Sequence, residues 1–183
     1  MARIPYLDKK DLAPQNQDLL TRNINLNRAF VHSPDALRSF TGLAQYIRHH
    51  SRLDPRLREM AILQVGYLTR SPYEYSHHIK IGREFGVRDE DIRAIEAEST
   101  GETTKLAPLE RAVLRAAREL TMSPNLSEAT FAALRSALDY ERLVDLLLVI
   151  SFYCGVVRLL AALQIDVEDD YLHYLKEFPL PER

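Results

Sequence analysis

Three residues able to transfer protons lie close together in the segment LDPRLREMAILQVGYLTRSPYEYSHHIKIGREFG, residues 53–86. They are Glu59, Glu74 and His78. Two carboxylates beside an imidazole can hold and donate a proton near neutral pH, because the carboxylates raise the histidine pKa while burial lowers it. The segment therefore predicts a site for acid–base chemistry if folding brings the three side chains together.

Helical periodicity indicates which side chains in the second half of this segment face inward. In a helix that begins at Pro72, at about 100° per residue, Glu74 and His78 lie on the apolar side. His77 falls at the border of that side, and Ser76 falls on the opposite, polar side. We therefore expect His78, rather than His77, to point into the protein.

Structural roles would explain the same residues. Ser71 and Glu74 have the spacing of a capping box, in which the glutamate would bond the Ser71 backbone amide. Glu59 would stabilise the positive end of its own helix, or pair with Arg56 or Arg58. A hydrogen-bonded core histidine is the corresponding role for His78. The sequence pattern alone leaves the structural and the catalytic interpretations open.

Other chemistries find less support in the sequence. There is no phosphate-binding loop, dinucleotide fingerprint, serine-nucleophile elbow or Cys-x-x-Cys pair. The set of Glu59, Glu74 and His78 could bind a metal, but Glu-x-x-x-His spacing is common in ordinary helices, so we expect no metal and no cofactor. The single cysteine, Cys154, excludes an intrachain disulfide and suits a reducing compartment. We expect it to be a small buried core residue.

The elements that must position these residues are all helical. The 183 residues, 46% hydrophobic, favour one domain spanning 1–183. No segment alternates as a strand does, so the predicted fold class is all-α, a bundle of about seven to nine helices. Helices are predicted over 25–32, 34–50, 55–70, 72–86, 89–97, 108–121, 127–137 and 140–164. Residues 1–24 should form an arm with a short helix, and the tail 166–183 should lie across the surface or a neighbouring subunit.

Composition restricts the partners and the location. The net charge of −2 predicts no nucleic-acid partner. The apolar stretch 143–163 is interrupted by Asp145 and Arg158, so its charge-free part is shorter than the roughly 20 residues of a membrane span. The first residues contain no apolar run of the kind found in signal peptides. We expect a soluble, cytoplasmic protein that does not bind membranes.

At these residues the sequence resembles the carboxymuconolactone decarboxylase family, part of the alkyl hydroperoxidase D-like superfamily. The resemblance covers much of the chain, and its most specific parts are the Arg58-Glu59 step and Tyr73-Glu74-Tyr75-x-x-His78. Further matching segments are ARIPYLD, PLERAVLRAARELT and ISFYCGVVRLLAAL. The resemblance implies an all-α bundle that forms homo-oligomers, commonly trimers or hexamers, with a dimer also possible.

The redox cysteines of the peroxidase branch are absent from this sequence. That branch uses a glutamate, a Cys-x-x-Cys pair and a histidine four positions later, and the matching residues here are Glu59, Ser71, Glu74 and His78. Thiol-dependent peroxidase chemistry requires a thiolate at these positions. Cys154 lies in another helix and cannot supply the pair.

The decarboxylase branch of the family keeps the glutamate–histidine arrangement without cysteines. It implies cofactor-independent loss of CO₂, or a related lyase or isomerase step, on a small cyclic or lactone acid. His78 would donate the proton, Glu74 would orient it, and Glu59 would be the second carboxylate of a relay. The supporting or pocket residues would be Ser71, Tyr73, Tyr75 and His77. The alternatives are a peroxide-reducing antioxidant protein and a non-catalytic oligomeric protein that binds small molecules.

Overall fold

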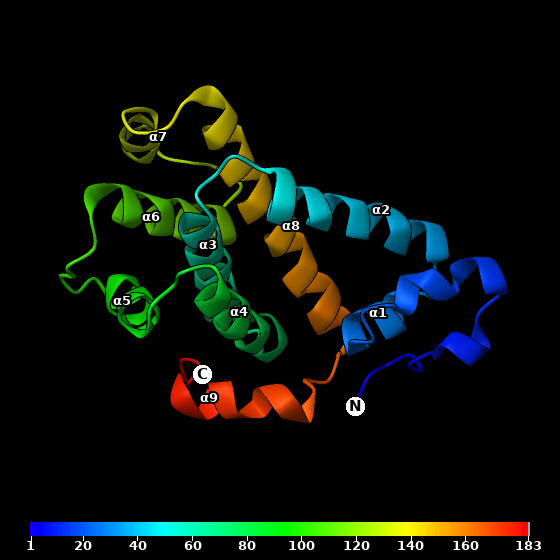
Figure 1. Cartoon of the computed structure of the whole chain (residues 1–183). Helices are drawn as coiled ribbons and strands as arrows, with labels where there is room; N and C mark the ends of the chain where they lie inside the picture. Colours follow the sequence, from blue (N-terminus) through cyan, green and yellow to red (C-terminus); the bar gives the residue numbers. More distant parts are fainter. Residues whose placement is uncertain (183) are drawn as a thin grey trace.

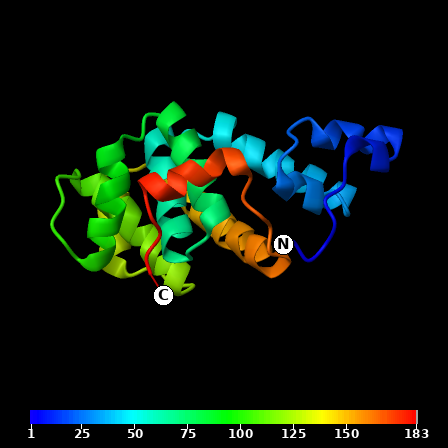
Figure 2. The same cartoon turned by 90° about the horizontal axis from the view of Figure 1, so that it is seen from below.

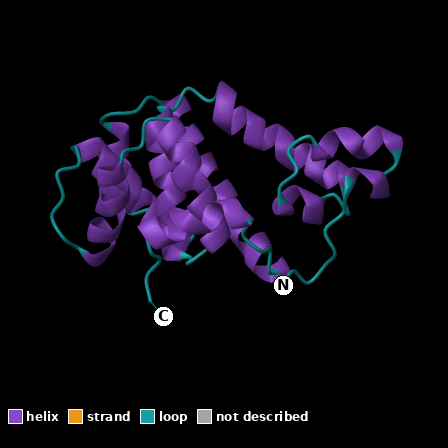
Figure 3. Cartoon of the chain, turned by 60° about the horizontal axis from the view of Figure 1, so that its bottom comes forward, coloured by secondary structure: helices purple, strands orange, loops and turns teal. Residues whose placement is uncertain are grey.

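The computed structural model describes residues 1–182 and is helical throughout, with no strand in that range (Figures 1 and 3). The predicted all-α class is confirmed. Arg183, the last residue of the predicted tail, lies outside the described residues. The α-helices are α1 (Asn25–Phe30), α2 (Pro34–Gln45), α3 (Pro55–Leu68), α4 (Pro72–Glu84), α5 (Asp89–Thr100), α6 (Pro108–Met122), α7 (Glu128–Arg135), α8 (Tyr140–Leu163) and α9 (Leu172–Glu177).

Proline and capping residues set where the main helices begin. Proline is the first residue of α2, α3, α4 and α6, where its missing N–H has no intrahelical partner to lose. The Asp54 side chain accepts a hydrogen bond from the Leu57 amide at 3.0 Å, and Ser71 caps α4 through the Glu74 amide at 3.5 Å. These starts agree with the sequence prediction.

The predicted helix 34–50 is not uniform, because its last part changes type. The α-helical hydrogen bonds stop at Gln45, and the chain continues as a π-helical turn, η3 (Tyr46–His50). Such turns are rare and occur frequently at functional sites. Asp145 of α8 holds this turn and the residue after it, accepting hydrogen bonds from Tyr46 Oη at 2.9 Å and Ser51 Oγ at 2.6 Å.

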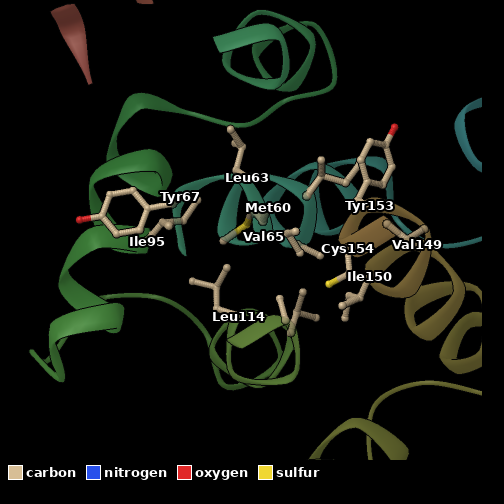
Figure 4. Close-up of a cluster of buried hydrophobic side chains, with 14 of the residues drawn as sticks. Met60, Leu63, Val65, Tyr67, Ile95, Leu114, Val149, Ile150, Tyr153 and Cys154 are labelled. Atoms are coloured by element: carbon tan, nitrogen blue, oxygen red, sulfur yellow. The ribbon is translucent and has the colours of Figure 1, made fainter. Parts of the chain in front are cut away.

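Helix α3 lies at the centre of the fold and contacts α4, α5, α6 and α8. Every residue of α3 from Leu57 to Tyr67 is buried, as its apolar composition predicts. Figure 4 shows Met60 and Leu63 of α3 in the cluster that also contains Leu114 of α6 and Ile150 of α8. At the edge of this core, Arg56 forms a bidentate pair with Asp91, at 2.7 and 2.8 Å, that joins α3 to α5.

By length and composition, α8 is the one helix among the described residues that could cross a membrane. Here it packs on α3 and α6 and contains the buried Asp145. The fold is that of a soluble helical protein. One side of α8 remains open to solvent, where Val144 is 62% and Leu159 is 44% exposed.

The two ends of the chain come together beside α4. The arm contains two short 3₁₀ helices, η1 (Lys9–Asp11) and η2 (Pro14–Leu20), and leads into α1. The tail contains η4 (Asp169–Tyr171) and then α9, which packs on α4 (Figure 2). Glu168 connects these parts, because its Oε1 accepts hydrogen bonds from the Asn25 amide at 2.6 Å and from Tyr73 Oη at 3.1 Å. The tail therefore crosses the surface of its own chain.

Helices α3 and α4 approach each other closely at Gly66. A Cβ atom placed on Gly66 would lie 3.2 Å from the Tyr75 backbone nitrogen and 3.3 Å from its Cα. Because both of these are backbone atoms, a larger residue could be accommodated only by separating the two helices. The absent side chain thus allows the helix bearing Glu59 to approach the helix bearing His78.

We predict that Gly66→Ala lowers the free energy of unfolding by about 1–3 kcal/mol, because it overpacks the α3–α4 contact. The measurement is urea denaturation followed by circular dichroism. Gly42→Ala in α2 is the matched control, since a Cβ there meets no atom within 4 Å. It should raise stability by about 0.5–1 kcal/mol, the usual gain for alanine over glycine within a helix. A Gly66 variant as stable as the Gly42 variant would contradict this account of the contact.

Candidate active site

The three predicted proton-transfer residues form one continuous string. His78 Nδ1 donates to Glu59 Oε2 at 2.6 Å, and His78 Nε2 lies 2.9 Å from Glu74 Oε1. Glu59 comes from the first turns of α3, and the other two come from α4. The helix break at Ser71-Pro72 folds α4 back along α3, which brings Glu59 to the histidine. Each ring nitrogen of His78 therefore faces one carboxylate.

Arg58 extends the string at its buried end. Its Nε donates to Glu59 Oε1 at 2.9 Å, and the exposed fractions of the two side chains are 2% and 1%. Its Nη1 donates to the Arg48 carbonyl at 3.1 Å, and its guanidinium lies 4.5 Å from the centre of the Phe85 ring. Of the two arginines expected as structural partners of Glu59, Arg58 is the one that pairs with it. Arg56 instead binds Asp91 and Glu110.

The charges of the string follow from these contacts. Burial lowers the pKa of His78, but Glu59 and Glu74 more than offset burial, so this pKa lies above its ordinary value. Burial raises the pKa of Glu59, but His78 and Arg58 more than offset it, so this pKa lies below its ordinary value. Both shifts favour the same charge state, an ionised Glu59 between the imidazolium of His78 and the guanidinium of Arg58.

Glu74 does not close the expected capping box. Ser71 Oγ accepts from the Glu74 amide, but the Ser71 amide donates to the Gly66 carbonyl at 3.0 Å. The Glu74 carboxylate turns to His78 instead. The structural interpretation is therefore wrong for the Glu74 side chain, which does not bond the Ser71 backbone amide. The carboxylate interacts with His78 and belongs to the string.

A cavity of about 380 Å³ opens beside the string. Its walls come from η2, α1, α2, the π-helical turn η3, α4 and α8, so it lies between the arm and the core. Glu74 and His78 both line it, whereas Glu59 does not. The apolar part of the wall includes Leu19, Ile24, Leu26, Phe40, Ile81, Phe152 and Val156. The cavity thus combines proton-transfer groups with a surface suited to an apolar ring.

Tyr153 of α8 lies beside the histidine. Its ring meets His78 edge to face, with the ring centres 5.0 Å apart, and it lines the cavity. Burial, together with Glu74 and Glu59, raises the pKa of Tyr153, so the hydroxyl keeps its proton and can donate a hydrogen bond. Nothing in the sequence around Tyr153 signalled this role, because α8 is far from the segment 53–86 in the chain.

The four predicted supporting residues lie in different places. Tyr73 and His77 line the cavity, but Ser71 and Tyr75 do not. Tyr73 donates from its hydroxyl to Glu168 and accepts from the Leu26 amide, at 3.1 Å each. Tyr75 packs against Tyr67 on the side that faces Gly66.

The prediction that His77 lies only at the border of the apolar side was wrong. His77 is as buried as His78, because the tail covers the second side of α4. Its ring is stacked between Tyr73 and Tyr171, with centres 4.1 and 3.7 Å away, and its Nδ1 lies 2.8 Å from the Tyr73 carbonyl. Ser76, expected on the polar side, is also fully buried. A helical wheel of α4 alone contains no information about the tail.

Three arginines that the sequence did not single out also line the cavity: Arg22, Arg38 and Arg48. They come from the arm, from α2 and from the π-helical turn. Among the described residues, no group of three His, Cys, Asp or Glu side chains is arranged to hold a metal ion. The polar side chains that line the cavity are thus carboxylates, imidazoles, guanidinium groups, two phenols, and the amides and hydroxyls of Asn, Gln and Thr residues.

Part of the chain matches a known protein family. Residues 34–119, which contain the whole Glu59–His78–Glu74 string, match the carboxymuconolactone decarboxylase family. The matched segment, together with the fold that the chain shares with solved structures, supports a relationship to the carboxymuconolactone decarboxylase and alkyl hydroperoxidase D-like superfamily. A comparison with curated proteins gave no match.

Solved structures with the same fold cover nearly all of the chain. A peroxidase-related protein from Ralstonia eutropha with an alkylhydroperoxidase core is 19% identical, with a TM-score of 0.79 over 93% of this chain and 94% of that one. The debrominase Bmp8, in complex with 2,3,4-tribromopyrrole, is 20% identical, with a TM-score of 0.79 over 97% and 100%. A peroxidase-related protein from Silicibacter sp. is 20% identical, with a TM-score of 0.71 over 93% and 95%. At this identity the likeness shows the fold.

We predict that Glu59→Gln lowers the pKa of His78. The substitution removes one of the two carboxylates that stabilise the imidazolium, while burial still destabilises it. In the wild type, His78 adds stability that is fully present below its unfolded pKa, about 6.5, and is lost as the pH rises through its raised folded value. The variant should lose that contribution at a lower pH. The measurement is the histidine NMR titration, together with the pH dependence of unfolding. Glu84→Gln, at an exposed position of α4, should leave the His78 titration unchanged.

Proposed function

We propose that this chain is a cysteine-free acid–base enzyme that removes CO₂ from a small cyclic or lactone-like acid, or carries out a related lyase or isomerase step, without a cofactor. The observation that carries the proposal is the Glu59–His78–Glu74 string, which ends in a cavity with apolar walls. The match of residues 34–119 supports the chemistry of this family, and the absence of the Cys-x-x-Cys pair favours the decarboxylase branch within it. The catalytic groups would be Glu74 and His78, with Glu59 as the positioning residue.

The proposed reaction has two steps. The bond between the ring carbon and the carboxylate breaks, CO₂ leaves, and the bonding electron pair stays on the ring as a dienolate. A proton then adds to the ring carbon. His78 supplies it from Nε2 through the Glu74 carboxylate, while Nδ1–H stays bonded to Glu59. One proton is consumed per turnover, so the string is recharged from solvent.

Two contacts support this division of roles. Glu59 is 1% exposed and does not line the cavity, so it acts on substrate only through His78, by fixing the ring and favouring its charged form. The protonated Tyr153 hydroxyl would donate to the enolate oxygen where negative charge develops. The roles predicted from sequence change accordingly: Glu59 orients the histidine, and Glu74 meets the substrate.

The peroxide-reducing alternative would require a thiol at the cavity. Cys154 is buried in α8, with its Sγ 3.7 Å from Thr121 Oγ1 of α6, and it does not line the cavity. Figure 4 shows Cys154 turned toward the apolar cluster, while the neighbouring Tyr153 points in another direction. The second alternative, a non-catalytic binding protein, loses one argument because Glu74 does not close a capping box.

We predict that Glu74→Gln and His78→Gln each lower turnover by about 10²–10⁴-fold, the usual contribution of a positioned acid or base. The assay is CO₂ release and solvent-deuterium incorporation with a panel of unsaturated lactone acids, beginning with 4-carboxymuconolactone. Circular dichroism verifies that the variants fold. Cys154→Ser is the control and should keep wild-type activity. A fully active His78→Gln enzyme would refute the proposal, and loss of activity in Cys154→Ser would point to thiol chemistry.

We also propose a cytoplasmic homo-oligomer that pairs through the open side of α8. The exposed Val144 and Leu159 support this, because isolated helical domains seldom leave the apolar side of a core helix in water. Val144→Glu should therefore reduce the mass measured by light scattering after size-exclusion chromatography, while circular dichroism stays the same. Glu128→Gln on α7 serves as the comparison. A wild-type chain that elutes as a monomer would contradict the proposal.

A further inference from the structure

The three arginines that line the cavity differ in whether their charge is already balanced. Arg38 is paired with Asp18, which also lines the cavity, at 2.9 Å. Arg22 lies on an exposed part of the arm. Arg48 is half-buried, and within residues 1–182 its side chain forms no hydrogen bond or ion pair. Within residues 1–182 the Arg22 side chain is also unpaired, so Arg48 is the less exposed of the two lining cations whose charge is available to a ligand.

The backbone that carries Arg48 is held firmly in place. Its carbonyl accepts a hydrogen bond from Arg58, the same side chain that binds Glu59. The neighbouring Ile47 is 1% exposed in the core, and Asp145 holds the turn through Tyr46 and Ser51. A cation on such a support is preorganised, so a ligand would not have to order the backbone beneath it.

The charges around the cavity indicate why a free cation is needed. Glu74 presents a carboxylate to the cavity and would repel an anionic ligand. Arg48 lines the same cavity as Tyr153, Glu74 and His78. A guanidinium binds a carboxylate through two parallel hydrogen bonds.

We infer that Arg48 binds a carboxylate of the substrate that stays in the product, and so fixes the ring between Tyr153 and the Glu74–His78 pair. The inference rests on the proposed function and adds the residue that selects acids over neutral rings. A guanidinium on the departing carboxylate would stabilise the ground state and oppose CO₂ loss. Bound to a retained carboxylate, it stabilises ground state and transition state alike.

A binding experiment tests the assignment without any turnover. The probes are 2-furoate, a planar ring carboxylate, and its neutral amide, 2-furamide, measured by titration calorimetry on the full chain. Arg48→Gln should weaken 2-furoate binding by roughly tenfold to a hundredfold, the worth of a charged hydrogen-bonded pair, and leave 2-furamide unchanged. Arg48→Lys should lie between the wild type and Arg48→Gln, since it keeps the charge but loses the planar fork.

Two comparison variants sharpen the result. Arg38→Gln should weaken 2-furoate binding less than Arg48→Gln, because Asp18 already balances Arg38. Arg111→Gln, at an exposed position of α6, should have no effect on either probe. The assignment is overturned if the wild type does not bind 2-furoate, if Arg48→Gln binds it normally, or if both probes are lost together.

The same variants separate this inference from the proposed function. With an active substrate, Arg48→Gln should raise KM and leave kcat nearly unchanged, as expected for uniform binding. Selective loss of 2-furoate in Arg48→Gln, with no turnover of any acid by the wild type, would keep the binding site and reject the decarboxylase. Turnover that depends on His78 but not on Arg48 would support the proposed enzyme and reject the role of Arg48 in binding the carboxylate.

Discussion

A buried ion pair between neighbouring residues, Arg58 and Glu59, supports both halves of the site. Burying two charges is costly, and the pair is tolerated because nearly all of its polar atoms have partners. Arg58 reaches the carbonyls of Ile47 and Arg48 and the ring of Phe85. Glu59 reaches His78. Losing one member of such a pair costs about 3–5 kcal/mol, because the other charge stays buried without compensation. The Arg58–Glu59 pair thus fixes the position of His78 relative to the π-helical turn.

The cavity exists because the arm and the tail are fastened to the helical core rather than being part of it. Residues of η2 and α1 form one wall, and Glu168 of the tail ties this wall to Tyr73 of α4. The opposite wall belongs to α8, where the ring of Tyr153 stands beside the histidine. The family match at residues 34–119 includes the proton-transfer string but neither of these walls. The walls that determine the shape of the cavity, and so which ligand fits, thus lie largely outside the matched segment.

Much of the helical framework could be predicted from the sequence, because local chemistry determines it. Proline at the first helical position, with Asp54 or Ser71 before it, indicated in the local sequence where these helices begin. The sequence places Glu59 and His78 in one segment but leaves open whether they meet, because their contact depends on α4 folding back along α3. His77 was misplaced because the tail that covers it is about ninety residues away in the chain. Arg48 and Tyr153 gave no signal, since neither residue type nor local spacing reveals which distant helices will face each other.

The closed end of the proton string has a kinetic consequence. Arg58 and Glu59 are 2% and 1% exposed, so within residues 1–182 the string has no second opening to solvent. A proton given up toward the cavity can be replaced only through the cavity. While a ligand fills that space, the string holds one transferable proton and cannot be recharged. Under the proposed function, each occupancy would therefore permit a single protonation, and departure of the product would be the step that resets the acid.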